Sequence, residues 1–194
     1  MIYLSIGELV DNPTVNRSLI KCGGQVIALT GRLRQMWFKG RLRIAECEFE
    51  DEELLKTLYK KGLVVIGNDY DYDTKYNMLC GCIVSSAKSS LKVSLTENEK
   101  MVYQWLRFAP FILHFPEMLS IYERGIKVEG QYIGQRNAQA LVKLILEPHG
   151  QYKNQKFFKK MFYSKKRDEL VDIYLGLLSK GKIILIQRKD SLYG

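Results

Sequence analysis

Three aspartates alternate with tyrosines in one short segment of the sequence: Asp69, Asp71 and Asp73. Divalent cations prefer oxygen ligands, and Glu46 or Glu48 could complete such a set. A magnesium ion held there would suit a metal-dependent nuclease. The run departs from a calcium-binding loop, because Thr74 stands where that loop needs glycine and Cys80 where it needs glutamate. The interleaved tyrosines are typical of a loop between strands, so we expect no metal ion and keep the nuclease as an alternative.

The sequence has few other residues that could bind a metal ion or act as nucleophiles. His114 and His149 are its only histidines, and both lie far from the cysteines. Structural zinc sites usually show two paired ligand motifs, and only one CxC pair is present. Without a secretory leader, we expect the cysteines to be reduced thiols in a cytoplasmic protein. The four cysteines are Cys22, Cys47, Cys80 and Cys82.

No catalytic motif accompanies these residues. The sequence lacks GxSxG, P-loop and GxGxxG patterns, and neither histidine stands in a context that pairs it with serine or cysteine. We therefore predict no catalytic residue and no cofactor, and we favour a binding protein over an enzyme.

The charge of the chain favours an anionic partner. Thirty lysines and arginines oppose 21 acidic residues, which gives a formal net charge of +9. Basic domains attract polyanions, above all nucleic acid and acidic membrane surfaces. The longest apolar runs, such as 108–115, fall well short of the roughly 20 residues that span a bilayer. We expect nucleic acid as the partner, and no membrane.

The local patterns predict a helix-rich α+β fold. Between Leu170 and Gln187, an amphipathic helix is followed by Gly181, which can end it, and by a short apolar strand. The same order recurs at 54–66 and more faintly at 119–128. The four residues from Thr96 to Glu99 match a capping box, which predicts that another helix begins there.

The polar stretch at residues 85–94 is the predicted boundary between two small subdomains with short β-hairpins. We expect an α+β subdomain at 1–90 and a mainly helical one at 91–194. The expected elements of the first are helices at 6–10, 14–22 and 52–61, a strand-turn-strand unit at 25–38, and strands at 63–67 and 77–85.

The end of the chain, at 148–194, resembles the winged-helix form of the helix-turn-helix, with a poorer version at 14–85. The pattern is a helix, a turn, a second helix and a β-hairpin. One departure is that the second strand of the wing, at 191–194, would be very short, so the wing is vestigial or its partner strand comes from elsewhere. The resemblance implies duplex DNA binding, with 165–179 as the recognition helix.

On this resemblance, cations of the recognition helix meet base edges and phosphates, while those of the preceding helix and the wing contact the backbone. Such a protein would be a regulator or an accessory factor of replication or transfer. The alternative is a protein-interaction adaptor, or a phage-type inhibitor, whose basic surface meets an acidic protein. Asp168 and Glu169 favour that alternative. The candidate nucleic-acid-binding residues are Lys153, Lys156, Lys159, Lys160, Lys165, Lys166, Arg167, Arg188 and Lys189.

A second basic group surrounds two aromatic residues, Trp37 and Phe38. Basic residues interleaved with aromatics can bind single-stranded nucleic acid by stacking bases on the rings. More often the aromatics are buried and the arginine stems cover them. The cations of this secondary patch are Arg32, Arg34, Lys39, Arg41 and Arg43.

Overall fold

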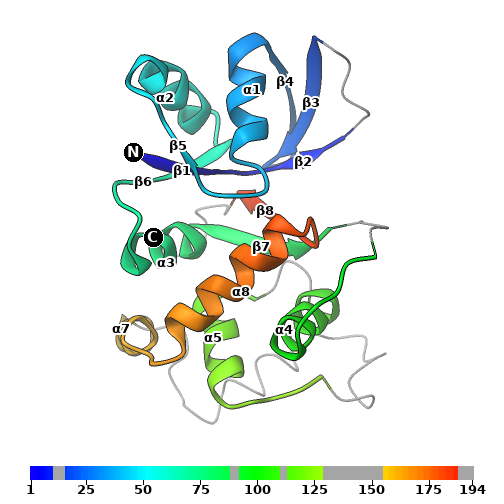
Figure 1. Cartoon of the computed structure of the whole chain (residues 1–194), viewed down its shortest axis with the longest axis vertical. Helices are drawn as coiled ribbons and strands as arrows, with labels where there is room; N and C mark the ends of the chain where they lie inside the picture. Colours follow the sequence, from blue (N-terminus) through cyan, green and yellow to red (C-terminus); the bar gives the residue numbers. More distant parts are fainter. Residues whose placement is uncertain (11–15, 88–91, 110–112, 129–154, 188–194) are drawn as a thin grey trace. The chain divides into compact units, whose positions relative to one another are not determined.

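The computed structural model describes residues 1–10, 16–87, 92–109, 113–128 and 155–187 (Figure 1). Helices and short antiparallel strands follow one another along the chain, which confirms the predicted α+β class. The chain divides into two compact units, Met1–Cys82 with the stretch from Ile184, and Ile83–Ile183.

This division differs from the sequence-based one at the C-terminal strand, β8 (Ile183–Gln187). The sequence suggested that this strand belongs with the second half of the chain. In the structure its residues from Ile184 onward group with the first unit. One reason is that the Gly7 amide donates a hydrogen bond to the Leu185 carbonyl at 2.8 Å.

In the first unit, β1 (Ile2–Ser5) is the central strand of a three-stranded antiparallel sheet. Its partners are β5 (Ala45–Glu46) and β6 (Val64–Gly67), and Tyr3 lies opposite both Ala45 and Ile66. All four residues of β1 are buried, so both faces of this strand are covered.

A second antiparallel sheet contains β2 (Glu8–Leu9), β3 (Arg17–Cys22) and β4 (Gln25–Thr30). The expected helices at 6–10 and 14–22 are therefore wrong. Every second residue of β3 is buried, which is the period of a strand. Gly23 and Gly24 have φ values of +58° and +87°, and they form a two-residue hairpin turn instead of ending a helix.

Three helices complete the first unit: α1 (Gly31–Lys39), α2 (Glu52–Lys60) and α3 (Tyr72–Cys80). α1 lies between α2 and β4 (Figure 1), where the sequence suggested a second strand. α2 is the predicted helix, and the 3-10 turn η1 (Phe49–Asp51) leads into it. α3 replaces an expected loop and the start of an expected strand, so only Cys82–Ser86 (β7) of that strand is extended.

Buried hydrogen bonds attach the C-terminal half of α1 to β1. The Tyr3 hydroxyl donates to the Met36 carbonyl at 3.0 Å, and the Ser5 hydroxyl donates to the Trp37 carbonyl at 2.7 Å. The Trp37 indole donates in return to the Ile6 carbonyl at 2.9 Å. Because all three bonds are buried, removing one partner leaves a polar group unsatisfied.

In the second unit, α8 (Arg167–Ser179) packs against α4 (Glu97–Phe108) and α5 (Phe115–Glu123), and α5 packs against α7 (Gln155–Phe162). The predicted capping box at Thr96 is confirmed. β7 and β8 form a two-stranded sheet. The proposed wing strand at 191–194 lies outside the described residues.

A part-buried ion pair joins the start of α4 to the end of α8. The Lys180 ammonium donates to both carboxylate oxygens of Glu99, at 2.6 and 2.7 Å. Gly176 leaves room for it, since a Cβ atom there would lie 3.0 Å from a Glu99 oxygen. Burial by itself raises the pKa of Glu99, but the bonds from Lys180 and Thr96 outweigh it and the net pKa is lowered.

We predict that Glu99→Gln lowers the free energy of unfolding at neutral pH by about 1–3 kcal/mol, because Lys180 loses its charged partner. The lowered pKa of folded Glu99 means that its ionised form stabilises the fold above its ordinary value of 4.5. That stabilisation is lost as the pH falls through the lower folded-state pKa. Urea unfolding followed by circular dichroism at neutral and at acid pH measures both effects.

The matched control for this prediction is Glu97→Gln, in the same first turn, where the side chain is exposed and forms an ion pair with Lys100. It should change stability little. If Glu99→Gln lowered the free energy of unfolding equally at neutral and at acid pH, the ionised carboxylate would not contribute to stability as proposed.

Candidate nucleic-acid interface

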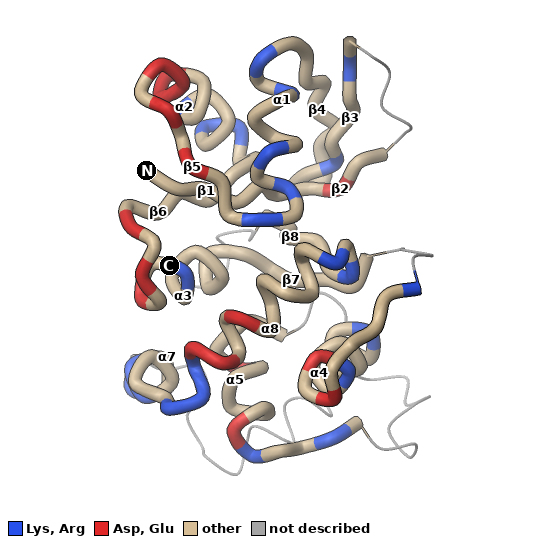
Figure 2. The backbone as a smooth tube through the Cα atoms, viewed as in Figure 1, with Lys and Arg blue, Asp and Glu red and all other residues tan. Residues whose placement is uncertain are grey.

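α7 has one cationic side and one apolar side. Lys156, Lys159 and Lys160 are exposed, and their spacing of three and four residues places them on one side of the helix. Met161 is buried, and the helix packs against α5. Figure 2 marks the lysines along α7 and the turn that follows it. The predicted backbone-binding lysines of this helix are therefore accessible to a ligand.

The turn between α7 and α8 extends this cationic surface. Lys165 is exposed, and the Tyr163 side chain is 72% exposed. Within the described parts of the chain, no carboxylate forms an ion pair with Lys156, Lys159, Lys160 or Lys165. We call these four lysines the lysine face.

The next two cations, Lys166 and Arg167, are paired with carboxylates. The Lys166 ammonium donates to Glu169 at 2.8 Å. The Arg167 guanidinium donates to Asp168 at 2.7 Å and to the Phe162 carbonyl at 3.1 Å, and it lies 5.0 Å from the centre of the Phe162 ring. Arg167 thus holds the turn between α7 and α8 together. The sequence had suggested that both side chains read base edges. In the structure Arg167 is largely covered, whereas Lys166 is exposed and shares a surface ion pair with Glu169.

Glu169 connects three helices of the second unit. It accepts hydrogen bonds from Lys166, from the Tyr122 hydroxyl of α5 and from the Asn98 amide of α4, the last at 3.0 Å. The Lys166 bond, followed by the Tyr122 bond, lowers the pKa of Glu169. Burial and then Glu169 raise the pKa of Tyr122. Glu169 is therefore ionised at neutral pH and places negative charge at the start of α8.

α8 is the packing centre of its unit, which does not suit a recognition helix. Its buried residues are Leu170, Val171, Ile173, Tyr174, Leu177 and Leu178. The Tyr174 ring meets Phe115 edge-on, with 4.8 Å between ring centres. Asp168 and Glu169 occupy its first turn and Asp172 is exposed, so the accessible side of α8 is acidic near its start. Lys153, Arg188 and Lys189 lie outside the described residues.

The secondary basic patch is largely committed to contacts within the first unit. Arg32 pairs with Asp51 at 2.6 Å and Lys39 with Glu48 at 3.4 Å. Arg34 donates to the Ser18 hydroxyl at 2.9 Å and lies 5.0 Å from the centre of the Phe38 ring. Arg32 and Lys39 thus share their charge with carboxylates, and Arg34 is held against residues of its own unit.

The predicted role of Trp37 as a stacking platform for bases is wrong, since this residue is 0% exposed. The Arg41 guanidinium lies 5.6 Å from the centre of the Trp37 ring, and burial lowers the pKa of Arg41. The arginine thus covers a buried aromatic, which was the alternative interpretation of the pattern. Arg43 is exposed.

Two of the aspartates considered as magnesium ligands accept hydrogen bonds from nearby backbone amides. Asp71 caps α3 by accepting the Thr74 amide at 2.6 Å, and this bond lowers the pKa of Asp71. Asp69 accepts the Tyr70 amide, also at 2.6 Å. The described residues, which include Asp73, Glu46 and Glu48, contain no group of three or more acidic, cysteine or histidine residues placed to hold a metal ion. Within these residues, the three aspartates are therefore not brought together as the alternative metal site required.

The cysteines are free thiols with structural surroundings. Cys80 ends α3 and Cys82 begins β7, so the CGC pair does not occupy alternate positions of one strand. The Cys22 thiol donates to the Gly62 carbonyl at 3.2 Å. Burial raises the pKa of both Cys22 and Cys82, which makes them poor nucleophiles at neutral pH.

Comparison of the chain with protein-family models, curated proteins and solved structures gave no match. Among the described helices, none combines the length and the apolar character needed to cross a bilayer. The geometry of the lysine face is therefore the main guide to function.

We predict that Arg167→Ala changes mainly the stability of the protein and that Lys165→Ala changes mainly its affinity for DNA. Arg167→Ala should lower the free energy of unfolding by about 1 kcal/mol, because contacts with Asp168 and Phe162 are lost, with little change in affinity for DNA. Lys165→Ala should weaken DNA binding and leave stability unchanged. Thermal unfolding and fluorescence anisotropy of a labelled duplex measure the two properties. If Arg167→Ala strongly weakened binding to the duplex without lowering the stability of the protein, Arg167 would belong to the DNA interface.

Proposed function

We propose that this protein is a non-catalytic nucleic-acid-binding protein that holds the phosphate backbone with the lysine face. The observation that carries the proposal is the exposure of four lysines, unpaired within the described chain, over only ten residues. Each lysine that neutralises a phosphate releases condensed counterions, so such a group binds polyanions well at moderate salt. The net charge of +9 adds long-range attraction.

The chemistry of the lysine face favours affinity over sequence reading. Arginine, asparagine and glutamine form the two-pronged hydrogen bonds that distinguish bases, whereas a lysine ammonium acts as a point charge. The nearest arginine, Arg167, is engaged with Asp168 and Phe162. The proposed contact is therefore with the backbone, and its affinity varies little among sequences.

Duplex DNA is the polyanion we assign to this surface. It presents one negative charge per about 1.7 Å of helix axis, so it gains more from lysine contacts than single strands do. The role that fits is an accessory or regulatory factor that holds DNA without reading it. The free, reduced cysteines suit a cytoplasmic setting.

The test is Lys159→Glu with Lys160→Glu, assayed by anisotropy of a labelled duplex over a salt series. For the wild-type protein, the logarithm of the binding constant should fall linearly with the logarithm of the salt concentration. The slope should be near −0.9 for each phosphate contacted. The double variant should bind at least about tenfold more weakly, and its slope should be shallower by about 2.

The matched control is Lys60→Glu with Lys61→Glu, an adjacent exposed lysine pair on the first unit with the same change in net charge. If both double variants lose the same affinity, net charge alone drives binding and the lysine face is not the site. If the wild-type chain binds no duplex, the protein-interaction alternative takes precedence. Circular dichroism checks that both variants keep their helices.

A further inference from the structure

Phe49 is the most exposed large apolar side chain among the described residues, at 87%. It lies in η1, immediately before α2. A single exposed apolar residue is common on protein surfaces, so exposure alone says little. Two further properties set this position apart: the turn around it forms ion pairs with α1, and its surroundings are strongly acidic.

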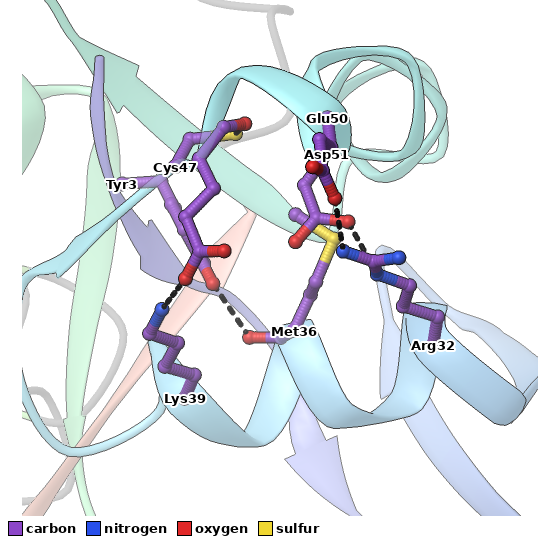
Figure 3. A network of polar contacts seen from close by, with 8 residues as sticks. Tyr3, Arg32, Met36, Lys39, Cys47, Glu50 and Asp51 are labelled. Carbon is purple, nitrogen blue, oxygen red and sulfur yellow. Dashed lines mark hydrogen bonds and ion pairs between the residues drawn. The ribbon is translucent and has the colours of Figure 1, made fainter.

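The residues on both sides of Phe49 are attached to α1. Before it, Glu48 pairs with Lys39 at 3.4 Å. After it, Asp51 and Glu50 pair with Arg32 at 2.6 and 3.7 Å. Figure 3 shows these ion pairs reaching α1 from the segment that holds Cys47, Glu50 and Asp51. The phenyl ring is therefore presented to solvent by a turn that contacts α1 on both sides of the ring.

The charge around Phe49 is opposite to that of the whole chain. Six of the eight residues from Glu46 to Glu53 are acidic, against a net charge of +9 for the protein. Their ion-pair partners are Arg32, Lys39 and Lys56, so the segment keeps a net negative charge. We call residues 46–53 the Phe49 turn. Its partner should offer cations around an apolar or aromatic contact.

The lysine face has that chemistry. Its four lysines surround Tyr163 in sequence, and the Tyr163 side chain is 72% exposed. We propose that the Phe49 turn of one copy docks on the lysine face of a second copy, with Phe49 against Tyr163 and carboxylates against lysines. An aromatic pair surrounded by opposite charges gains both from burial and from attraction.

Such a contact joins two different surfaces, so each copy can offer one and accept the other. A head-to-tail contact of this kind grows into longer assemblies as the concentration rises, unless the geometry closes a ring. The contact is small and depends on charge, so it should be weak and sensitive to salt. It uses the lysines assigned above to DNA; the resulting competition rests on the proposed function, whereas self-association does not.

The experiment is sedimentation velocity of the full chain over a concentration series. At about 50 mM salt the average mass should rise with concentration, and at about 500 mM salt the protein should be monomeric. Phe49→Ser should weaken self-association at least about tenfold, and it should leave duplex binding unchanged at protein concentrations where the wild type is monomeric. The control is Val26→Ser, another exposed apolar residue of the first unit, which should self-associate like the wild type.

A mixing experiment tests the pairing of the two surfaces. Phe49→Ser keeps the lysine face, and Lys159→Glu with Lys160→Glu keeps the Phe49 turn. Each variant alone should be monomeric, and their mixture should form a 1:1 complex that does not grow, because only one complementary contact remains. Duplex DNA should dissociate the wild-type assemblies.

Each outcome decides one of the two proposals. A wild-type chain that stays monomeric at every concentration overturns the self-association, and duplex binding is then judged by anisotropy alone. Assembly that persists in Phe49→Ser overturns the docking surface. Assembly that DNA leaves intact, in a chain that binds DNA, shows that the two contacts use different surfaces and overturns the shared lysine face. Self-association without any DNA binding overturns the proposed function only.

Discussion

Ion pairing with carboxylates determines which cations of this basic chain can meet a partner. At the start of α8, Lys166 and Arg167 direct their charge to Glu169 and Asp168. A few residues earlier, the lysines of α7 have no such neighbours in the described chain. The same rule operates in the first unit, where Arg32 is paired with Asp51. The sign and size of the net charge therefore do not identify a binding surface, and the pairing of each cation has to be considered.

The sequence predicts those parts of the fold whose signals are local. α2 has acidic residues at its start and Lys60 at its end, and α4 begins with a capping box, so both helices could be placed to within about two residues. The errors concern pairing between distant segments. β3 carries Leu19 and Ile20 side by side, which suits a helix as well as a strand, and only its ladders with β2 and β4 decide. α1 begins at Gly31 behind Thr30, which makes no side-chain capping bond, so its start has no clear signal.

In the candidate site too, local features could be predicted from the sequence, and features that depend on distant residues could not. The lysines of α7 could be placed on one side of a helix, because three-and-four spacing is a property of the sequence. The engagement of Arg167 depends on the Phe162 carbonyl and ring, whose position is set by the turn between two helices. The burial of Trp37 likewise depends on β1, more than thirty residues away in the chain. Asp71 could have been recognised from sequence, since Asp-x-x-Thr before a helix is an N-cap pattern.

A surface made of lysines raises the question of selectivity, because any polyanion of sufficient charge can bind it. The Phe49 turn offers an answer built into the chain, since a competitor of moderate charge density sets a threshold for other ligands. An acidic protein with scattered carboxylates would bind the lysine face too weakly to displace this competitor, whereas a duplex with regularly spaced phosphates would bind tightly enough. The aromatic contact of Phe49 adds to the threshold without adding charge, and the threshold falls as salt screens the ion pairs and the copies separate. Selectivity for nucleic acid would then arise from competition within the protein population, and no contact with a base would be needed.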